Sequence, residues 1–547
     1  MERNAEISYL RSREPLDVPY MTIPELIRHH AEKTPESIAQ VCIDWETFER
    51  KTMTFNDLYT QATRVAKGLQ RFGLRKGDFV AIGTDNCPEW MLSVIGVLMC
   101  GAVSIFFTFD RIDGEDVKSV LSKVGDKCKV FIFPKGKNDC YVPIVNKLFE
   151  QHQEKEKVTC EYAKSIEVAI AMTLETDSSF FCLDTLMNLD AFDGSFTNSS
   201  PEDIACIFMT SGSTGQPKLI PHSHLSIIGA GFHFSLGFPC WEIFSGGTRV
   251  YIKHPSFIPS IQQYLKIIHK SLQLEKCTGS LLITSILQEI SQDRSLEWNL
   301  ENVVAGGQPI PFSLVKSASS FCQNFVVVYG ASEVFMLSFL VCAKNADYPD
   351  YIVGTPLPGV EIKVVDTDGN VLKRGERGEA YSRSSIPFNG YFGDSEKTSQ
   401  VLTTGGWYKT DDSAIITIDG RLIIDGRMSD SLVKSTGTGF LSVAFAEGHL
   451  KQHPLVRDAA VLSLYDYNHF PCVCCAVILK DGAAVLENQM EEYLLDSKEH
   501  ITSLYKQINV PKKFIFFEKF PKTYNGKVNR KELAYQCKGK FENFKKI

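Results

Sequence analysis

One stretch of the chain reads Phe208-Met209-Thr210-Ser211-Gly212-Ser213-Thr214-Gly215-Gln216-Pro217-Lys218, and the apolar run 204–209 leads into it. A buried strand that ends in alternating hydroxyl and glycine residues presents many hydrogen-bond donors and little bulk, which suits a polyphosphate. Lys218 adds a positive charge at the end of this loop. Clusters of Gly, Ser and Thr are also typical of turns and linkers, but the preceding strand and the Pro217-Lys218 ending favour a phosphate site.

The loop differs from the P-loop of nucleotide triphosphatases, because its lysine follows a proline and no Ser or Thr comes next to hold magnesium. It resembles the phosphate-binding loop of the adenylate-forming superfamily, which includes acyl-CoA synthetases, luciferases and peptide-synthetase adenylation domains. Leu219 stands where that family's pattern ends in glycine. The phosphate ligands that the resemblance implies are Thr210, Ser211, Gly212, Ser213, Thr214, Gly215 and Lys218.

The composition is that of an ordinary soluble globular protein. With 547 residues, 44% hydrophobic and 22% charged, the chain is too long for one packed core, and we expect two to four structural units. The formal net charge of −7 gives no reason to expect nucleic acid or an anionic membrane surface as a partner. An anionic substrate must therefore be held by local groups.

The cysteines and the chain ends indicate a cytoplasmic compartment. The 16 cysteines form no obvious disulfide framework, and residues 1–6 lack the apolar core of a secretion signal and the acid-poor character of a mitochondrial leader. Lys545-Lys546-Ile547 is not the peroxisomal type of C-terminus. Cys472-Val473-Cys474-Cys475 could suggest a metal site, but the apolar run 473–479 favours cysteines in a buried strand.

The uncharged run Trp90–Phe107 just reaches the length of a transmembrane helix. Pro88 and Glu89 suit the first turn of a helix, Gly101 suits its end, and 102–107 is a β-type segment. We therefore interpret the run as a helix, a glycine and a buried strand, and expect no transmembrane segment.

Strands alternate with helices over the first half of the chain. Thr54 can cap a helix that Gly73 closes, and the segments that follow are a strand at 79–82, a helix at 88–100, a strand at 102–106, a helix near 115–124 and a strand at 129–133. This alternation predicts a mainly parallel α/β sheet, in which ligands gather beyond the carboxyl ends of the strands. From about 351 the short β-type runs predict a small β subdomain, and the last unit is of mixed α/β type.

Three further stretches follow in the order of the adenylate-forming superfamily. They are Ala305-Gly306-Gly307-Gln308-Pro309, Tyr329-Gly330-Ala331-Ser332-Glu333 and Gly406-Trp407-Tyr408-Lys409-Thr410-Asp411-Asp412. A glycine-rich strand end lets a flat adenine or an acyl chain lie against backbone, an aromatic face can stack on adenine, and a carboxylate can ligate Mg²⁺. Each stretch taken alone could be a tight turn or solvated surface.

By resemblance these residues take roles in binding ATP. Gly306, Gly307, Gln308, Tyr329 and Gly330 would lie at the nucleotide, and the two glycines also at the acyl group. Ser332 would reach the α-phosphate, and Glu333 would ligate Mg²⁺. Asp412 would accept hydrogen bonds from the ribose hydroxyls, with Arg427 as a second ribose or phosphate contact. Asp411 stands where the family usually has glycine.

The last stretch is Pro521-Lys522-Thr523-Tyr524-Asn525-Gly526-Lys527-Val528-Asn529-Arg530, which is similar to the superfamily's C-terminal lysine motif. A lysine outside a motif usually lies on the surface as a solvated charge, so only the surrounding motif distinguishes Lys527 from the other lysines. It would relieve the repulsion between an attacking carboxylate and the anionic α-phosphate. The resemblance implies that the C-terminal domain then rotates about Ser429, so that Lys527 leaves and the side with Lys434 and Gly437 enters to admit a thiol, usually coenzyme A.

The fold implied by the resemblance is an α/β adenylate-forming enzyme. It has a large N-terminal domain of stacked parallel α/β layers plus a small β subdomain, over residues 1–428. A small mobile α+β C-terminal domain with the catalytic lysine follows over 429–547. Ser429 and Phe445, the latter in place of a usual glutamate, are further departures from the family's pattern.

One departure touches the acyl pocket. Only 21 residues separate His224 from Gly246-Gly247, whereas relatives have a much longer stretch that builds part of that pocket. His233 falls where the family's pocket histidine could be, and an ordinary packed histidine is the alternative. Five aromatic residues could line a pocket or belong to the core: Phe232, Phe234, Phe238, Trp241 and Phe244.

Three functions follow from these observations. The first is an acyl-CoA synthetase that uses ATP, Mg²⁺ and coenzyme A to activate a small-molecule carboxylic acid, a medium-chain fatty or aryl acid. The second is an amino-acid-activating protein that works with a carrier protein. The third is a nucleotide-binding homologue that no longer catalyses because the pocket is shortened.

Overall fold

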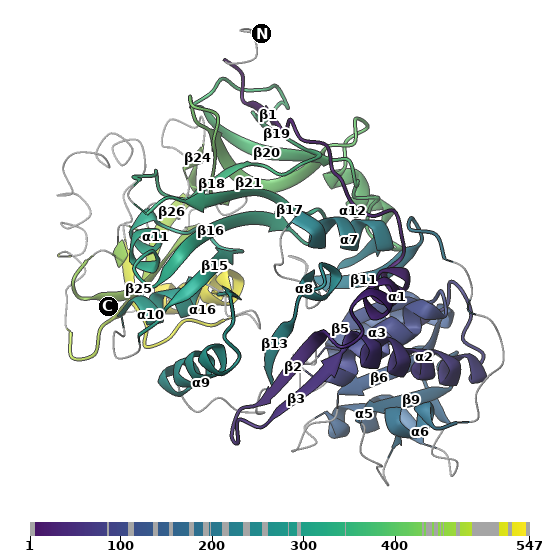
Figure 1. Cartoon of the computed structure of the whole chain (residues 1–547). Coiled ribbons are helices and arrows are strands. Elements are labelled where there is room, and N and C mark those ends of the chain that lie inside the picture. Colours follow the sequence, from purple (N-terminus) through teal and green to yellow (C-terminus); the bar gives the residue numbers. More distant parts are fainter. Residues whose placement is uncertain are drawn as a thin grey trace.

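The structure is a computed structural model (Figure 1). The residues that it describes are 6–84, 87–107, 114–134, 141–151, 157–173, 180–189, 196, 199–210, 218–233, 241–253, 261–282, 284–292, 297–344, 346–428, 432–433, 440–441, 447–448, 450–451, 453–465, 471–483, 489, 513–522 and 528–542.

A seven-stranded sheet forms the first α/β layer, and its strands lie in the order β10-β9-β6-β4-β5-β11-β12. Neighbouring strands run parallel, except that β12 returns antiparallel to β11. Successive side chains enter two different cores, as Phe131 and Ile132 do, so both faces are buried. The strands are β4 (Phe79–Gly83), β5 (Val103–Phe107), β6 (Cys128–Pro134), β9 (Val168–Met172), β10 (Phe181–Cys182), β11 (Ile204–Thr210) and β12 (Lys218–Ser223).

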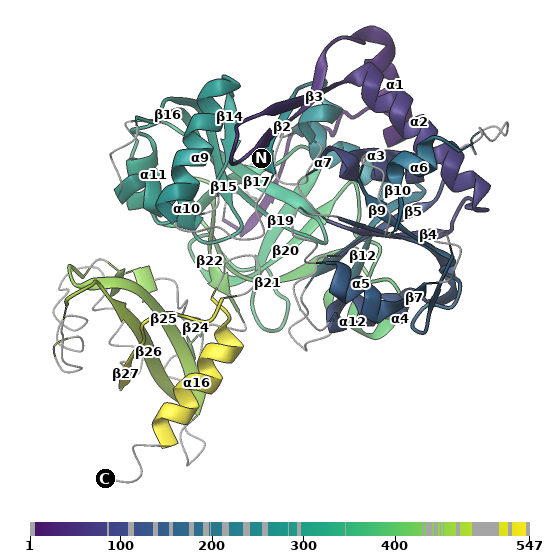
Figure 2. The same cartoon turned by 90° about the horizontal axis from the view of Figure 1, so that it is seen from below.

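Helices cover both faces of this sheet (Figures 1 and 2). The expected cap is present, since the Thr54 side chain accepts from the backbone N–H of Asp57 and the Asp57 carboxylate accepts from that of Thr54. One face carries α1 (Ile23–Lys33), α2 (Phe55–Arg71), α3 (Pro88–Met99) and α6 (Leu183–Met187), and the other carries α4 (Glu115–Val124) and α5 (Val142–Leu148).

The apolar run Trp90–Phe107 is divided between helix α3 and strand β5, which confirms the interpretation made from the sequence. Both elements are buried in the first layer rather than joined into one long helix. Among the described residues, no helix combines the length and the apolar character that a membrane crossing requires.

A ten-stranded sheet forms the second layer, in the order β1-β19-β20-β21-β22-β18-β17-β16-β15-β14. Only β14, β15 and β16 run parallel to one another. Val304 and Val326 point into the core of the first layer, while Val303 and Phe325 face a second core with α10 and α11. The strands are β1 (Tyr9–Arg11), β14 (Gly279–Leu281), β15 (Leu300–Gly306), β16 (Cys322–Ala331), β17 (Phe335–Cys342), β18 (Ile352–Pro356), β19 (Val360–Val365), β20 (Arg377–Ser384), β21 (Tyr408–Ile416) and β22 (Leu422–Arg427).

The β-type runs predicted beyond residue 351 are present, and they continue the second layer through the pairing of β17 with β18. Strand β21 begins at Tyr408, so the Gly406–Asp412 motif lies mostly in this strand. Leu281 ends strand β14, and the helix that follows begins at Thr284. The helices at this layer are α9 (Ile261–Leu274), α10 (Thr284–Gln292), α11 (Phe312–Ala318) and α12 (Ser395–Val401).

Smaller elements complete the larger part of the chain. Strands β13 (Arg249–Lys253), β2 (Ile38–Asp44) and β3 (Arg50–Thr54) form a three-stranded sheet, and β7 (Phe149–Gln151) pairs with β8 (Val158–Cys160). Helices α7 (His224–His233) and α8 (Trp241–Phe244) lie between the two large layers (Figure 1).

The C-terminal unit has its own small core. Its sheet has the order β25-β26-β27, and α16 packs on it through Leu533 and Cys537. Cys474 and Cys475 are buried in β26, as the apolar run predicted. The elements are β23 (Leu432–Val433), β24 (Phe440–Leu441), β25 (Val456–Tyr465), β26 (Pro471–Leu479), β27 (Lys513–Phe516) and α16 (Arg530–Glu542). The boundary at residue 429 lies outside the described residues and stays a prediction.

Candidate functional site

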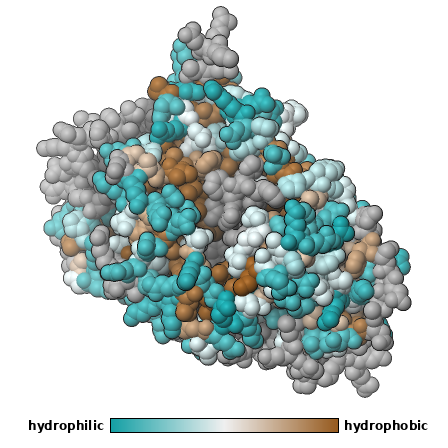
Figure 3. Space-filling view, viewed as in Figure 1, coloured by the Kyte–Doolittle hydropathy of each residue, from teal (hydrophilic) through white to brown (hydrophobic). Residues whose placement is uncertain are grey.

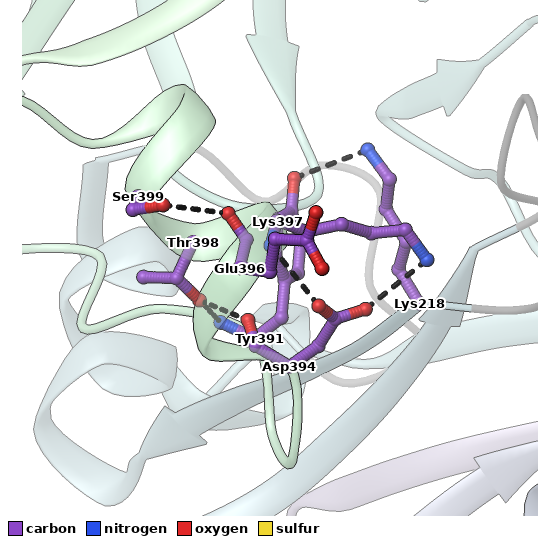
Figure 4. Close-up of polar contacts among 7 residues, drawn as sticks. All are labelled: Lys218, Tyr391, Asp394, Glu396, Lys397, Thr398 and Ser399. Carbon is purple, nitrogen blue, oxygen red and sulfur yellow. Dashed lines mark hydrogen bonds and ion pairs between the residues drawn. The ribbon is translucent and has the colours of Figure 1, made fainter.

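The candidate phosphate loop joins two antiparallel strands. Strand β11 ends at Thr210, and Lys218 opens β12 directly opposite Thr210 in the ladder. The Lys218 ammonium donates to the Tyr391 hydroxyl at 3.2 Å and lies 4.8 Å from the centre of its ring (Figure 4). Ser211 to Gly215 and the side chain of Thr210 fall outside the described part of the structure.

Glu333 lies in the turn between β16 and β17, where Ser332 is exposed and the glutamate is 9% exposed. Glu333 Oε1 accepts a hydrogen bond of 2.7 Å from the Tyr391 hydroxyl. Burial and the nearby Glu333 charge raise the pKa of Tyr408. Burial and the Glu333 charge raise the pKa of Tyr391, so its hydroxyl remains protonated and keeps donating.

Asp412 joins three of the predicted motifs. Its Oδ2 accepts a hydrogen bond of 2.6 Å from the Tyr329 hydroxyl, and its Oδ1 lies 3.2 Å from Nε of Arg427. Asp412 is opposite Arg427 in the β21–β22 ladder, and Arg427 also donates to the carbonyl of Thr410 at 2.6 Å. Burial raises the pKa of Asp412, while the Arg427 charge and the Tyr329 hydrogen bond oppose that rise.

Two glycines of the motifs are required by close backbone packing. A Cβ at Gly306 would collide with the carbonyl of Val328, and one at Gly330 with the carbonyl of Phe335. Gly307 and Gln308 are exposed just after β15, at the carboxyl end of that strand. The glycine-rich end of β15 thus has the open backbone that was expected there, and the binding of adenine to it stays a prediction.

Two buried histidines lie in β12 and α7, and His222 contacts the site. His222 Nε2 bonds to the carbonyl of Ser332 at 2.8 Å, and its ring lies 4.0 Å from that of Phe335. Nδ1 of His224 accepts a hydrogen bond of 3.2 Å from the backbone N–H of Ile23, at the start of α1. Burial lowers the pKa of each histidine to about 4, so both are neutral at physiological pH.

A small, partly open cavity of about 40 Å³ lies beside Glu333, and most of its lining residues are apolar. The space-filling view shows apolar residues gathered along a hollow between the β16–β17 part of the chain and the α7–α8 part (Figure 3). Among the described residues that line it, only Glu333 and His222 are ionisable. The others are Leu16, Ser226, Gly229, Val334, Phe335, Met336, Leu357, Pro358, Val360, Ser384, Ile386 and Pro387.

This cavity differs from the pocket expected from the sequence. Gly306 and Gly307 do not line it, and Phe244 is a core residue of 2% exposure whose carbonyl oxygen lies 2.9 Å from His30 Nε2. The side chain of His233, together with those of Phe232 and Trp241, is outside the described part, as are residues Phe234 and Phe238.

Three other predicted residues also lie outside the described residues. They are Lys527, Lys434 and Gly437. Arg530, the last residue of the C-terminal lysine motif, is described. It donates to Glu447 Oε1 at 2.6 Å and to the carbonyl of Val461 at 2.9 Å.

Sequence reasoning missed three residues that the fold brings to Glu333. Tyr391 comes from the segment between β20 and α12, far from every quoted motif, and only its Gly390-Tyr391 pair marks a turn. Tyr408 and His222 lie in or beside quoted stretches, but a buried tyrosine or histidine within a strand carries no signal that separates a site residue from a core residue.

The fold and this arrangement define an adenylate-forming enzyme. An anthranilate CoA ligase, AuaEII, solved in complex with anthranoyl-AMP, matches with a TM-score of 0.79 at 20% identity, over 95% of this chain and 98% of that one. ATP-bound MatB from Rhodopseudomonas palustris matches with a TM-score of 0.74 at 19% identity, over 94% of this chain and 99% of that one.

More particularly, the chain belongs to the AMP-binding enzyme family, whose model matches residues 27–392, and the C-terminal domain model of that family matches residues 446–527. Among curated relatives, the mitochondrial medium-chain acyl-CoA ligase ACSF2 of Mus musculus is 23% identical over 97% of this chain and 90% of its own length. A putative acyl-CoA synthetase, YngI of Bacillus subtilis (strain 168), is 24% identical over 94% of this chain and 96% of its own length.

Proposed function

We propose that the protein is an ATP-dependent, AMP-forming acyl-CoA synthetase for a monocarboxylic acid with an uncharged tail, a medium-chain fatty acid or an aryl acid. The observation that carries this proposal is the mostly apolar cavity beside Glu333, whose carboxylate is linked through Tyr391 to Lys218. Tyr329, Asp412 and Arg427 form a second hydrogen-bonded group. The relatives named as acyl-CoA ligases support the same reaction class.

In the first half-reaction an oxygen of the acid's carboxylate bonds to the α-phosphorus of ATP. The bond from that phosphorus to the bridging oxygen breaks, and pyrophosphate leaves. Asp412, whose two oxygens contact Tyr329 and Arg427, would accept hydrogen bonds from the ribose hydroxyls with its remaining lone pairs. Lys218 would bind the phosphates. Ser332 would contact the α-phosphate. Lys527 would offset the repulsion between the two reacting anions.

In the second half-reaction the sulfur of coenzyme A bonds to the acyl carbon, and the bond from that carbon to the AMP oxygen breaks. The thiol proton is released, and AMP leaves. Lys434 and Gly437 would lie on the side that admits the thiol, after rotation about Ser429. These roles follow from the family resemblance and stay predictions, since all three residues are outside the described part.

Magnesium fits the groups at Glu333. The carboxylate is a hard oxygen donor, and the Tyr391 hydrogen bond takes only one lone pair of Oε1, which leaves others for a cation that also binds phosphate oxygens. When bound there, Mg²⁺ would neutralise charge that develops on the phosphates. Glu333 is the one protein ligand that we propose for it.

The cavity also bears on the class of acid. Since His222 is neutral and Glu333 would serve the metal, the described lining residues include no cation to pair with a second carboxylate and no further carboxylate to pair with an α-ammonium group. Dicarboxylic acids and amino acids are therefore poorer candidates than acids with uncharged tails, and the amino-acid-activating alternative gains no support.

Exchange of labelled pyrophosphate into ATP tests the proposal, with a panel of medium-chain fatty, aryl, dicarboxylic and amino acids. We expect exchange with fatty or aryl acids, and a thioester when coenzyme A is added. Exchange with amino acids alone would contradict the proposal. The absence of exchange in a protein that binds ATP would identify the nucleotide-binding homologue that has lost catalysis.

We further propose a cytoplasmic location. The cysteines whose side chains the structure describes form no disulfide and, apart from Cys277, are buried, as in a reducing compartment. The ACSF2 relatives are named as mitochondrial, so fractionation of cells into cytosol and mitochondria is the direct test. Recovery in the mitochondrial fraction would overturn this part of the proposal.

A further inference from the structure

Tyr391 lies between two groups of opposite charge. Its hydroxyl accepts a hydrogen bond from Lys218 Nζ and donates one to Glu333 Oε1, at 3.2 and 2.7 Å (Figure 4). Within the described residues, Lys218 and Glu333 form no direct ion pair. One phenol oxygen therefore links the lysine of the phosphate loop to the carboxylate proposed for magnesium.

The position of Tyr391 is fixed through its backbone. Its N–H donates to Thr398 Oγ1 at 3.0 Å, and that hydroxyl donates in turn to the carbonyl of Asp394, which opens α12 (Figure 4). On the other side, the N–H of Phe392 donates to the carbonyl of Leu219, the residue after Lys218. The loop is thus tied both to α12 and to the strand that carries the lysine.

The ring of Tyr391 is fixed as well. The residue is 6% exposed and packs in a small core with Ile220, Phe388 and Tyr408, with its ring centre 5.1 Å from that of Phe388. A side chain held at backbone and ring has few other rotamers, so little freedom is left to the hydroxyl.

The charges explain what such a bridge can do. Glu333 is buried and Lys218 is half-buried, so an ammonium and a carboxylate on either side of one hydroxyl attract each other. A direct pair would occupy the groups that phosphate and metal need. The phenol satisfies one donor of Lys218 and one lone pair of Glu333. Two ammonium N–H groups and the remaining carboxylate lone pairs are left for ligands.

We propose that Tyr391 is a positioning residue, which holds Glu333 and Lys218 apart and oriented for magnesium and for the phosphates of ATP. The inference rests on the proposed adenylation function and deepens it. Tyr391 touches neither reacting atom. Its effect is expected in the binding of the magnesium–nucleotide complex, because removal of a group that orients a metal ligand typically costs about 10- to 100-fold in metal affinity or activity.

The test is the Tyr391→Phe variant, which keeps the ring and removes the hydroxyl. Calorimetric binding of ATP to the whole protein, without acid, is measured at increasing Mg²⁺ and in EDTA. We expect the Mg²⁺ concentration for half-maximal binding to rise about 10-fold. The affinity for ATP in EDTA is expected to fall by a smaller factor. The thermal unfolding midpoint of the variant without ligand should stay within about 2 °C of that of the parent.

A double-mutant cycle with Glu333→Gln tests the route of the effect. If Tyr391 acts through the carboxylate, its replacement changes the Mg²⁺ dependence in the parent protein but not in the Glu333→Gln background. Tyr251→Phe is the matched control, since Tyr251 is also buried and its hydroxyl donates to Gln40 Oε1, outside this site. This control should bind Mg–ATP like the parent.

An unchanged Mg²⁺ dependence in Tyr391→Phe would overturn the inference. An equal change of the Mg²⁺ dependence in the parent and in the Glu333→Gln background would assign Tyr391 a structural role, and this result would also overturn the inference. The outcome is separable from that of the proposed function, because ATP binding needs no acid. A parent protein that binds Mg–ATP but exchanges no pyrophosphate refutes the synthetase and leaves the role of Tyr391 to be decided by the cycle.

Discussion

At the scale of single residues, the neighbouring aspartates Asp411 and Asp412 differ in their physical situation. Asp412 is 6% exposed, and both of its oxygens have partners in Tyr329 and Arg427. Asp411 has a backbone φ of 59°, in the left-handed region that favours glycine. Its carbonyl accepts from Met428 at 2.7 Å and its N–H donates to Glu379 Oε1 at 3.0 Å, so the unusual conformation is held from both sides.

Replacement of Asp411 tests the cost of this conformation. We expect Asp411→Gly to be at least as stable as the parent, and Asp411→Ala to be less stable than Asp411→Gly by about 1 kcal/mol, because alanine pays the left-handed penalty without the local hydrogen bonds open to aspartate. Urea unfolding of the variants measures the difference. Equal midpoints for the alanine and glycine variants would show that the backbone is not strained at this position.

At the scale of elements, a buried ion pair fastens β20 to β22 next to the candidate ribose site. Arg377 pairs with Asp425, whose side chain is fully buried, two residues before Arg427. Removal of one partner from such a pair leaves an uncompensated charge, whereas loss of an exposed pair costs little.

We therefore expect Arg377→Met to lower the free energy of unfolding by about 3 to 5 kcal/mol. Arg28→Met is the matched control, since it breaks the Arg28–Glu32 pair of 3.7 Å on the exposed face of α1 and should cost less than about 1 kcal/mol. Urea denaturation compares the two. Similar losses in both variants would contradict the account of the Asp425 pair.

A second contact between elements predicts a pH dependence. His224 receives the N–H of Ile23 at the start of α1, and Asp203, Glu25 and Lys76 supply the charges around it. Since its pKa is about 4 in the folded protein and near 6.5 in the unfolded chain, the unfolded state binds the additional proton as the pH falls. Stability is thus present above pH 6.5 and is lost as the pH falls toward 4, by on the order of 3 kcal/mol.

The variant His224→Gln isolates this effect, because glutamine can accept the same backbone hydrogen bond but does not titrate. The free energy of unfolding, measured in urea between pH 7.5 and pH 4.5, should fall less steeply in the variant than in the parent. His222, with a pKa also near 4, accounts for part of the remaining slope. Parallel curves for variant and parent would exclude His224 as a source.

At the scale of the whole molecule, periodicity and motif order predicted most of the fold. The buried strands 79–82 and 129–133 and the helix capped by Thr54 were predictable because each carries a local pattern. The long sheet that joins the parallel strands to the β-rich part could not be predicted, since the pairing of β17 with β18 depends on residues that show no distinctive pattern.

The candidate site was predictable only where residues lie in recognisable motifs. Tyr329, Asp412 and Arg427 meet because their strands occupy one sheet, although the sequence places Tyr329 and Asp412 more than eighty residues apart. Tyr391 enters from the segment between β20 and α12, and no local pattern connects it to Glu333. Tertiary contacts of this kind are set by packing, so the structure was needed to find them.

Acid-dependent exchange of pyrophosphate into ATP, compared between the parent and Lys527→Ala, tests the adenylation account most directly. With a medium-chain fatty or aryl acid, the account predicts exchange in the parent and a loss of at least about 100-fold in the variant, while ATP binding stays close to that of the parent. A parent that binds ATP but exchanges with no acid, or a variant that retains full exchange, would contradict the account.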